Sequence, residues 1–180
     1  GGVNGQQIVV ETLDDAYAQI TELGKMTGHD DKAAATIAAM KSSIEASSKK
    51  FTKPAVKLKV YHELDNTLYS ASSKSFIGAL YALAGLENIA DGADKTGTGY
   101  PQLNPEYLLA QNPDLIFLAD VKCCGQSAKT LASRAGWADL KAVKAGSVIE
   151  LEDDIASRWG PRTPLLYDSI ANAVAKLAHA

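Results

Sequence analysis

Residues 104–120, NPEYLLAQNPDLIFLAD, place a short helix directly before a buried strand, and this succession indicates the fold class. Asn104 and Pro105 are typical of a helix start, because asparagine caps the first backbone N–H groups and proline fits the first helical position. The helix is expected to end before Asn112 and Pro113. The uninterrupted apolar run in DLIFLA is typical of a strand buried on both faces of a parallel sheet.

The flanking segments continue this alternation of helix and strand. Two more strands are predicted at residues 56–60, where Val56, Leu58 and Val60 alternate with lysines, and at residues 147–151. Helices are predicted at residues 75–84, at 127–135, and from Thr163 to the end of the chain. The inner face of this last helix is expected to carry Leu165, Ile170, Val174 and Leu177. The sequence therefore predicts an α/β fold with a mostly parallel sheet covered on both sides, a three-layer Rossmann-like arrangement.

The first fifty residues are predicted to form two helices. Thr12 and Asp15 have the spacing of a capping box, and the segment from Gly24 to Gly28 weakens or ends that helix. A second helix is expected over residues 31–50, with Asp30 as a possible cap. One apolar stripe runs along it, formed by Ala33, Ile37, Met40 and Ile44. A helix of this length measures roughly 30 Å, which is long for so small a domain.

Composition limits the classes of protein to be considered. A chain of 180 residues with 46% apolar content suits one compact domain, with or without a helical extension. The formal charge of -3 offers no basic field and argues against nucleic acid as the main partner. No apolar run approaches the roughly 18 to 20 residues that span a bilayer. The start of the chain has no signal-peptide pattern, so the protein is either cytosolic or a leader has been removed.

Four loops are expected to form a ligand-binding mouth. In a parallel sheet, ligands bind just beyond the carboxyl ends of the strands. The loops at those ends are residues 63–75, 120–126 and 152–162, and they are rich in acidic, aromatic and arginine side chains. Residues 96–104 add a glycine-rich segment with one tyrosine.

The order of three segments, NPEYLLAQNPDLIFLAD, RAGWADLKAVKAGSVIEL and SRWGPR, resembles the C-terminal lobe of the helical-backbone (class III) substrate-binding proteins of ABC importers, cobalamin and ferric-siderophore type. The upstream segment YHELDNTLYSASSKSFIGALYALAGLENIAD is similar to the first strand, ligand loop and helix of that lobe. The resemblance covers residues 56–180. It implies that residues 1–52 hold an N-terminal strand remnant and helices, including the long interlobe helix, and that residues 53–180 form the C-terminal α/β ligand-binding lobe.

Members of the family have a second, N-terminal lobe that this sequence lacks. We therefore expect the chain to be a piece of a protein nearly twice as long, with a natural one-lobe protein as the alternative. The resemblance implies an extracytoplasmic protein, periplasmic or a cell-surface lipoprotein, that captures a metal chelate between two lobes. It would deliver the chelate to the transmembrane subunits of an ABC permease. Contact with the membrane would come only through a leader or lipid anchor absent from this sequence.

The resemblance also implies binding without catalysis. No cofactor is expected, because the metal arrives as part of the chelate, which could be a ferric siderophore, cobalamin or haem. His29, His62 and His179 are scattered and no metal-ligand spacing is present, so no metal site is predicted.

Five residues are implied as ligand-binding: Tyr69, Tyr100, Asp154, Arg158 and Trp159. Aromatic side chains offer large flat contact area with few rotamers to freeze, and a guanidinium grips oxygen atoms in a fixed fork. Simpler roles remain open for all of them. The tyrosines could fold over their own loops, and Trp159 could plug its loop onto the sheet. Arg158 could form a salt bridge with Asp154 or with Asp153.

Glu106 is implied to dock into an arginine pocket of the permease, although an acidic residue in a first helical turn is also favoured by the helix dipole. Cys123 and Cys124 are adjacent, and either a vicinal disulfide or two packed thiols fits the sequence.

A Rossmann-like small-molecule enzyme domain is the alternative function, and a stand-alone interaction module is the third possibility. No G-x-S-x-G segment is present, and TGTGY lacks the lysine of a phosphate-binding loop.

Overall fold

A four-stranded parallel sheet lies at the centre of the part of the chain described by the computed structural model, residues 10–156 and 158–178. The strands follow the order β2-β1-β3-β4. Each neighbouring pair is parallel, and Tyr61 of β1 lies opposite Ile116 of β3. The strands are β1 Lys59–Glu63, β2 Glu87–Asn88, β3 Leu115–Leu118 and β4 Val148–Glu150.

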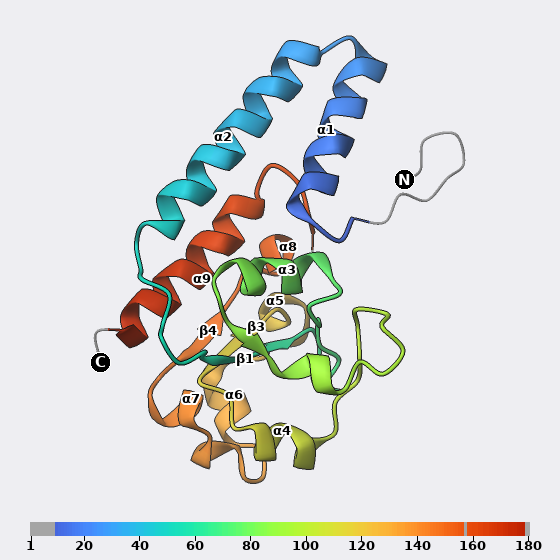
Figure 1. Cartoon of the computed structure of the whole chain (residues 1–180). Coiled ribbons are helices and arrows are strands. Elements are labelled where there is room, and N and C mark those ends of the chain that lie inside the picture. The colour runs from blue at the N-terminus through green and yellow to red at the C-terminus, as the bar shows by residue number, and fades with distance from the viewer. Residues whose placement is uncertain (1–9, 157, 179–180) are drawn as a thin grey trace.

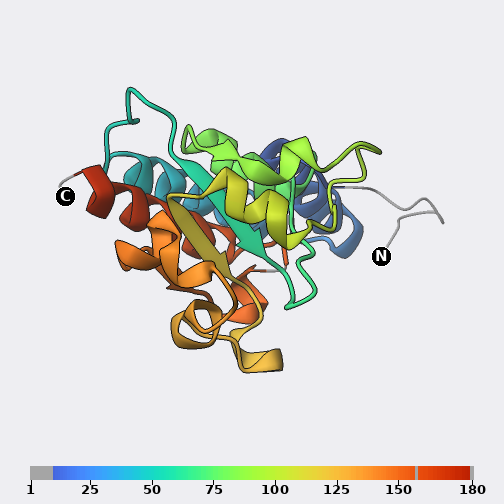
Figure 2. The ribbon, with the colours of Figure 1, turned by 90° about the horizontal axis from the view of Figure 1, so that it is seen from below.

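Helices cover both faces of this sheet, as Figure 2 shows. Successive residues of a strand point to opposite faces, so Val60 and Phe117 enter one apolar cluster while Tyr61 and Ile116 enter the other. The first face is covered by α3 Phe76–Leu83 and α9 Thr163–Ala178. The second face is covered by η1 Ile89–Gly92, α4 Pro105–Gln111, α6 Ala128–Ala132, η2 Trp137–Asp139 and α7 Lys141–Lys144. The predicted three-layer α/β arrangement is confirmed.

The two N-terminal helices form a hairpin that projects from the sheet domain (Figure 1). α1 Leu13–Thr27 begins at the predicted capping box and ends at Gly28, whose positive φ of 68° suits glycine. α2 Asp30–Ser48 packs against α9, where Asp168 accepts hydrogen bonds from Ser47 and Lys50, each of 2.5 Å. The predicted long helix is therefore present and is tied to the lobe at its end.

The division of the chain at residue 52 stays a prediction. The strand remnant expected before the first helix falls mainly on residues 1–9, outside the part that the structure describes. Within that part, no helix is long and apolar enough to cross a membrane.

Several local predictions were wrong. Val56 is 81% exposed, and β1 begins only at Lys59, because the preceding lysine-rich segment leaves the sheet. Asp30 is the first residue of α2, and the capping position belongs to His29, whose side chain makes no cap hydrogen bond. Leu165 is 51% exposed, because the stripe that faces the sheet starts one residue later, at Leu166. The sequence analysis also missed β2, whose two residues are too short for a pattern.

Candidate functional site

The predicted mouth loops meet at one edge of the sheet. The loops after β1, β3 and β4 all leave from carboxyl ends, which lie at the same edge of a parallel sheet. The last two carry short helices, α5 Val121–Cys124 and α8 Asp153–Ala156, which lie side by side. The glycine-rich segment joins the first loop through backbone hydrogen bonds, with Ser72 N–H donating to the Gly99 carbonyl at 2.8 Å.

Three of the predicted ligand residues line one small hollow. Tyr100, Arg158 and Trp159 surround a cavity of about 50 Å³, here called the aromatic hollow. Both aromatic rings are partly open to solvent, at 49% exposure for Tyr100 and 41% for Trp159. Partial burial raises the pKa of the Tyr100 hydroxyl, which stays protonated. The remaining lining comes from Val10, Phe76, Ile77, Ile155, Ala156 and Leu166. The hollow therefore brings two aromatic side chains and one arginine together.

Asp94 holds the loop that presents Tyr100. Its carboxylate accepts hydrogen bonds from the Ser72 hydroxyl at 2.7 Å and from the backbone N–H groups of Thr98 and Gly99, both at 3.0 Å. The Ser72 hydrogen bond is the largest cause of a lowered pKa for Asp94. Gly99 has a φ of 86°, a conformation that favours glycine. These hydrogen bonds thus fix the conformation of the turn that precedes Tyr100.

The Asp154–Arg158 pair is loose. Arg158 Nη2 lies 3.9 Å from Asp154 Oδ1, and the two side chains are 75% and 43% exposed. Exposed ion pairs contribute about 0–1 kcal/mol, so this contact leaves the guanidinium available to a ligand. The other acid considered as a partner, Asp153, has a side chain that lies outside the described part of the structure.

Tyr69 lies apart from the aromatic hollow. It is 42% exposed, and its backbone forms an antiparallel bridge with Gln102. The lining of the hollow does not include it. Tyr69 therefore lies opposite Gln102 on the paired segments and is not part of the wall of the hollow.

Glu106 is exposed on the first turn of α4. The helix starts as predicted, with the Asn104 side chain accepting a hydrogen bond from Tyr107 N–H at 2.7 Å. An open groove of about 530 Å³ runs beside this helix start and is lined by residues 66–68 and 102–105. Glu106 does not line this groove, and its side chain is exposed to solvent.

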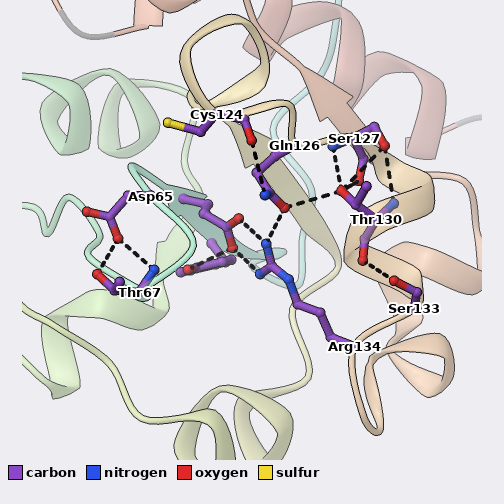
Figure 3. A network of polar contacts seen from close by, with 10 residues as sticks. Asp65, Thr67, Cys124, Gln126, Ser127, Thr130, Ser133 and Arg134 are labelled. Carbon is purple, nitrogen blue, oxygen red and sulfur yellow. Dashed lines mark hydrogen bonds and ion pairs between the residues drawn. The ribbon is translucent and has the colours of Figure 1, made fainter.

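A buried ion pair at the same edge was missed by the sequence analysis. Glu63 is fully buried at the end of β1, and Arg134 grips both of its oxygens, with two hydrogen bonds of 2.6 Å. Gln126 accepts a further bond from Arg134 Nη2 at 2.8 Å, as Figure 3 shows. The guanidinium also lies 4.7 Å from the centre of the Trp137 ring. Bidentate charged hydrogen bonds of this kind fix geometry strongly.

Asp120 lies beside this pair and is fully buried. Neither of its carboxyl oxygens accepts a hydrogen bond among the described residues, but the protonated group can donate one to the Glu63 carboxylate. Burial, followed by the negative charge of Glu63, raises the pKa of Asp120 to about 7. The signal that could have found both acids is their position, since each is an acidic residue at the carboxyl end of a buried strand.

Cys123 and Cys124 are joined by a disulfide and are exposed on α5. The structure therefore favours the first of the two alternatives left open by the sequence. Among residues 10–156 and 158–178, no group of three or more His, Cys, Asp or Glu side chains is placed to hold a metal ion.

A sequence comparison identifies the family of this chain. The family described as periplasmic binding protein matches residues 5–155. The chain belongs to this family.

Two curated relatives of this periplasmic binding protein have informative names. It is 31% identical over 166 residues to the uncharacterized ABC transporter substrate-binding lipoprotein YvrC of Bacillus subtilis, covering 86% of this chain and 50% of YvrC. It is 32% identical over 106 residues to a cobalamin-binding protein of Halobacterium salinarum, covering 58% of this chain and 28% of that protein. The chain thus spans half of the first relative and about a quarter of the second.

Solved structures agree with the fold. The haem-binding protein RhuT from Roseiflexus superposes with a TM-score of 0.77 at 21% identity, over 93% of this chain and 65% of RhuT. CeuE from Helicobacter pylori, with Ni(II) bound, gives a TM-score of 0.78 at 21% identity, over 94% of this chain and 53% of CeuE. At this level of identity the match establishes that this periplasmic binding protein shares their fold.

Proposed function

We propose that this chain forms one wall of a metal-chelate site in an extracytoplasmic substrate-binding protein of an ABC importer. The aromatic hollow is the observation that carries the proposal. A large, flat chelate such as a corrinoid, a haem or an aryl siderophore can stack on Tyr100 and Trp159. Arg158 can then grip a carboxylate, phosphate or amide oxygen of the same ligand. The names of YvrC and of the cobalamin-binding relative support this class of protein.

The proposed chemistry is binding without turnover. The metal belongs to the cargo, and the protein supplies ring faces and one oriented cation. The opposite wall would come from a second lobe, joined through α2, and the long helix would limit how far the lobes move. Delivery would be to an ABC permease.

The test is a ligand titration of the protein that carries both lobes, followed by tryptophan fluorescence. Cobalamin, a ferric hydroxamate siderophore and haem are the probes. We expect saturable quenching by one of the three, and roughly tenfold weaker affinity in each of Tyr100→Ala and Arg158→Ala, because each removes a central contact. Arg162→Ala is the matched control, since Arg162 is exposed on the same loop but lines a different groove. Failure of all three chelates to bind would overturn the proposal.

We also propose that Glu106 contacts the permease. Glu106 is exposed at the start of α4 and does not line the aromatic hollow, so binding and docking can be separated. Glu106→Lys is expected to keep chelate affinity within about twofold and to abolish ligand-stimulated ATP hydrolysis by the permease, because the charge is inverted in a salt bridge. Glu22→Lys, an exposed acid on α1, is the control. Unchanged stimulation by Glu106→Lys would exclude this docking role.

A further inference from the structure

The disulfide between Cys123 and Cys124 has no evident structural task. A disulfide stabilises a fold mainly by closing a long loop in the unfolded chain. This one joins adjacent residues and closes only the small ring that the two cysteines form. Both cysteines are exposed, on a single helical turn at the carboxyl edge of the sheet. The exposed position of this disulfide therefore favours reaction with a soluble thiol over a role in stabilising the fold.

We propose that Cys123–Cys124 is a redox site that dithiols reduce in the folded protein, and that its redox state is transmitted through Gln126 to the buried Glu63–Arg134 pair. The proposal does not depend on which chelate the protein binds.

The reaction is an ordinary thiol–disulfide exchange. A thiolate of the dithiol attacks one cysteine sulfur, the S–S bond breaks, and the other cysteine leaves as a thiolate that takes up a proton. The second thiol of the reagent then attacks the mixed disulfide and releases the first cysteine. Two electrons pass from the dithiol, which becomes a cyclic disulfide, to the cysteine pair, which becomes two thiols.

Gln126 connects this turn to the buried pair. Its Nε2 donates to the Cys124 carbonyl at 3.5 Å, and its Oε1 accepts from Arg134 Nη2 at 2.8 Å (Figure 3). The turn itself is closed by Gly125 N–H donating to the Val121 carbonyl at 2.9 Å. Opening the small disulfide ring frees the peptide between the cysteines to change conformation. A displaced Cys124 carbonyl would remove one of the two hydrogen bonds that orient the Gln126 amide, the other being donated by Thr130 Oγ1 at 3.2 Å, and so would shift a contact that holds the Arg134 guanidinium.

Trp137 reports on this movement. Its ring is buried and lies 4.7 Å from the guanidinium carbon of Arg134, so its emission senses where that charge lies. The chain has two tryptophans, and Trp159→Phe leaves Trp137 as the single emitter. The link can be cut with Gln126→Met, which keeps the length of the side chain and removes both hydrogen-bonding atoms.

The experiment titrates the Trp159→Phe chain with dithiothreitol in native buffer, counting reactive thiols and recording Trp137 emission. We expect no thiol before reduction, two after it, and an emission change with the same midpoint that reverses on reoxidation. In Gln126→Met the thiols should appear as before while most of the emission change is lost. Cys123→Ser/Cys124→Ser should not respond.

Four results would overturn the proposal. Free thiols in the air-oxidised protein would mean that the disulfide does not form. Reduction only in denaturant would mean that it is not a redox site of the folded protein. Two thiols with unchanged Trp137 emission, or a full change in Gln126→Met, would remove the transmission through Gln126.

Discussion

Replacing Arg134 by methionine is expected to lower the free energy of unfolding by about 3–5 kcal/mol at pH 7. The change leaves Glu63 fully buried without the cation that now binds both of its oxygens. An unpaired buried charge is much more costly than a missing pair, because the desolvation penalty remains while the attraction is lost. Urea denaturation followed by circular dichroism measures the difference.

Two controls separate this cause from a general effect of losing an arginine. Lys49→Met removes a pair with Glu45 whose side chains are 73% and 69% exposed, and should leave stability nearly unchanged because solvent screens such a pair. Glu63→Gln combined with Arg134→Met removes both charges and should recover at least half of the loss. A cost below about 1 kcal/mol for Arg134→Met would contradict the importance of the buried pair.

The fold was largely predictable because its signals are local. Capping residues such as Thr12 and Asn104 lie directly before the helices that they start. The apolar run of β3 indicates a buried strand without information from the rest of the chain. The errors occurred where tertiary packing, and not the local sequence, determines whether a residue is buried. Val56 and Leu165 are apolar residues in plausible patterns, and only the position of the sheet leaves them exposed.

The site was predictable where topology alone places residues. The rule that parallel strands bring their carboxyl ends to one edge predicts that the loops holding Tyr100, Arg158 and Trp159 lie close together, and these residues line one hollow. The family resemblance singled out the three residues, and their role in ligand binding stays a prediction. The Glu63–Arg134 pair could not be found in the same way. The two residues are 71 positions apart, and Arg134 comes just after the short helix α6. Pairing over such a distance is visible only in three dimensions.

Asp120 gives the second large prediction, a dependence of stability on pH. Burial raises its pKa from 3.8 in the unfolded chain to about 7 in the fold, so the native state binds the proton more tightly. Its presence therefore costs stability progressively as the pH rises from about 4 to about 7, and the cost is constant above that window. Asp120→Asn removes the titrating group. Its stability relative to the natural chain should rise by about 2–3 kcal/mol between pH 5 and pH 8.

The comparison must be made as a difference between the two proteins at each pH, because another buried group acts in the opposite sense. Burial lowers the pKa of His62 from 6.5 to about 3, so His62 favours the fold above pH 6.5 and loses that contribution as the pH falls. His62 titrates alike in both proteins and cancels from the difference. Glu22→Gln, at an exposed position, should show a nearly flat difference. If the Asp120→Asn difference is equally flat, then Asp120 is ionised in the fold at both pH values and its buried carboxylate has found a partner.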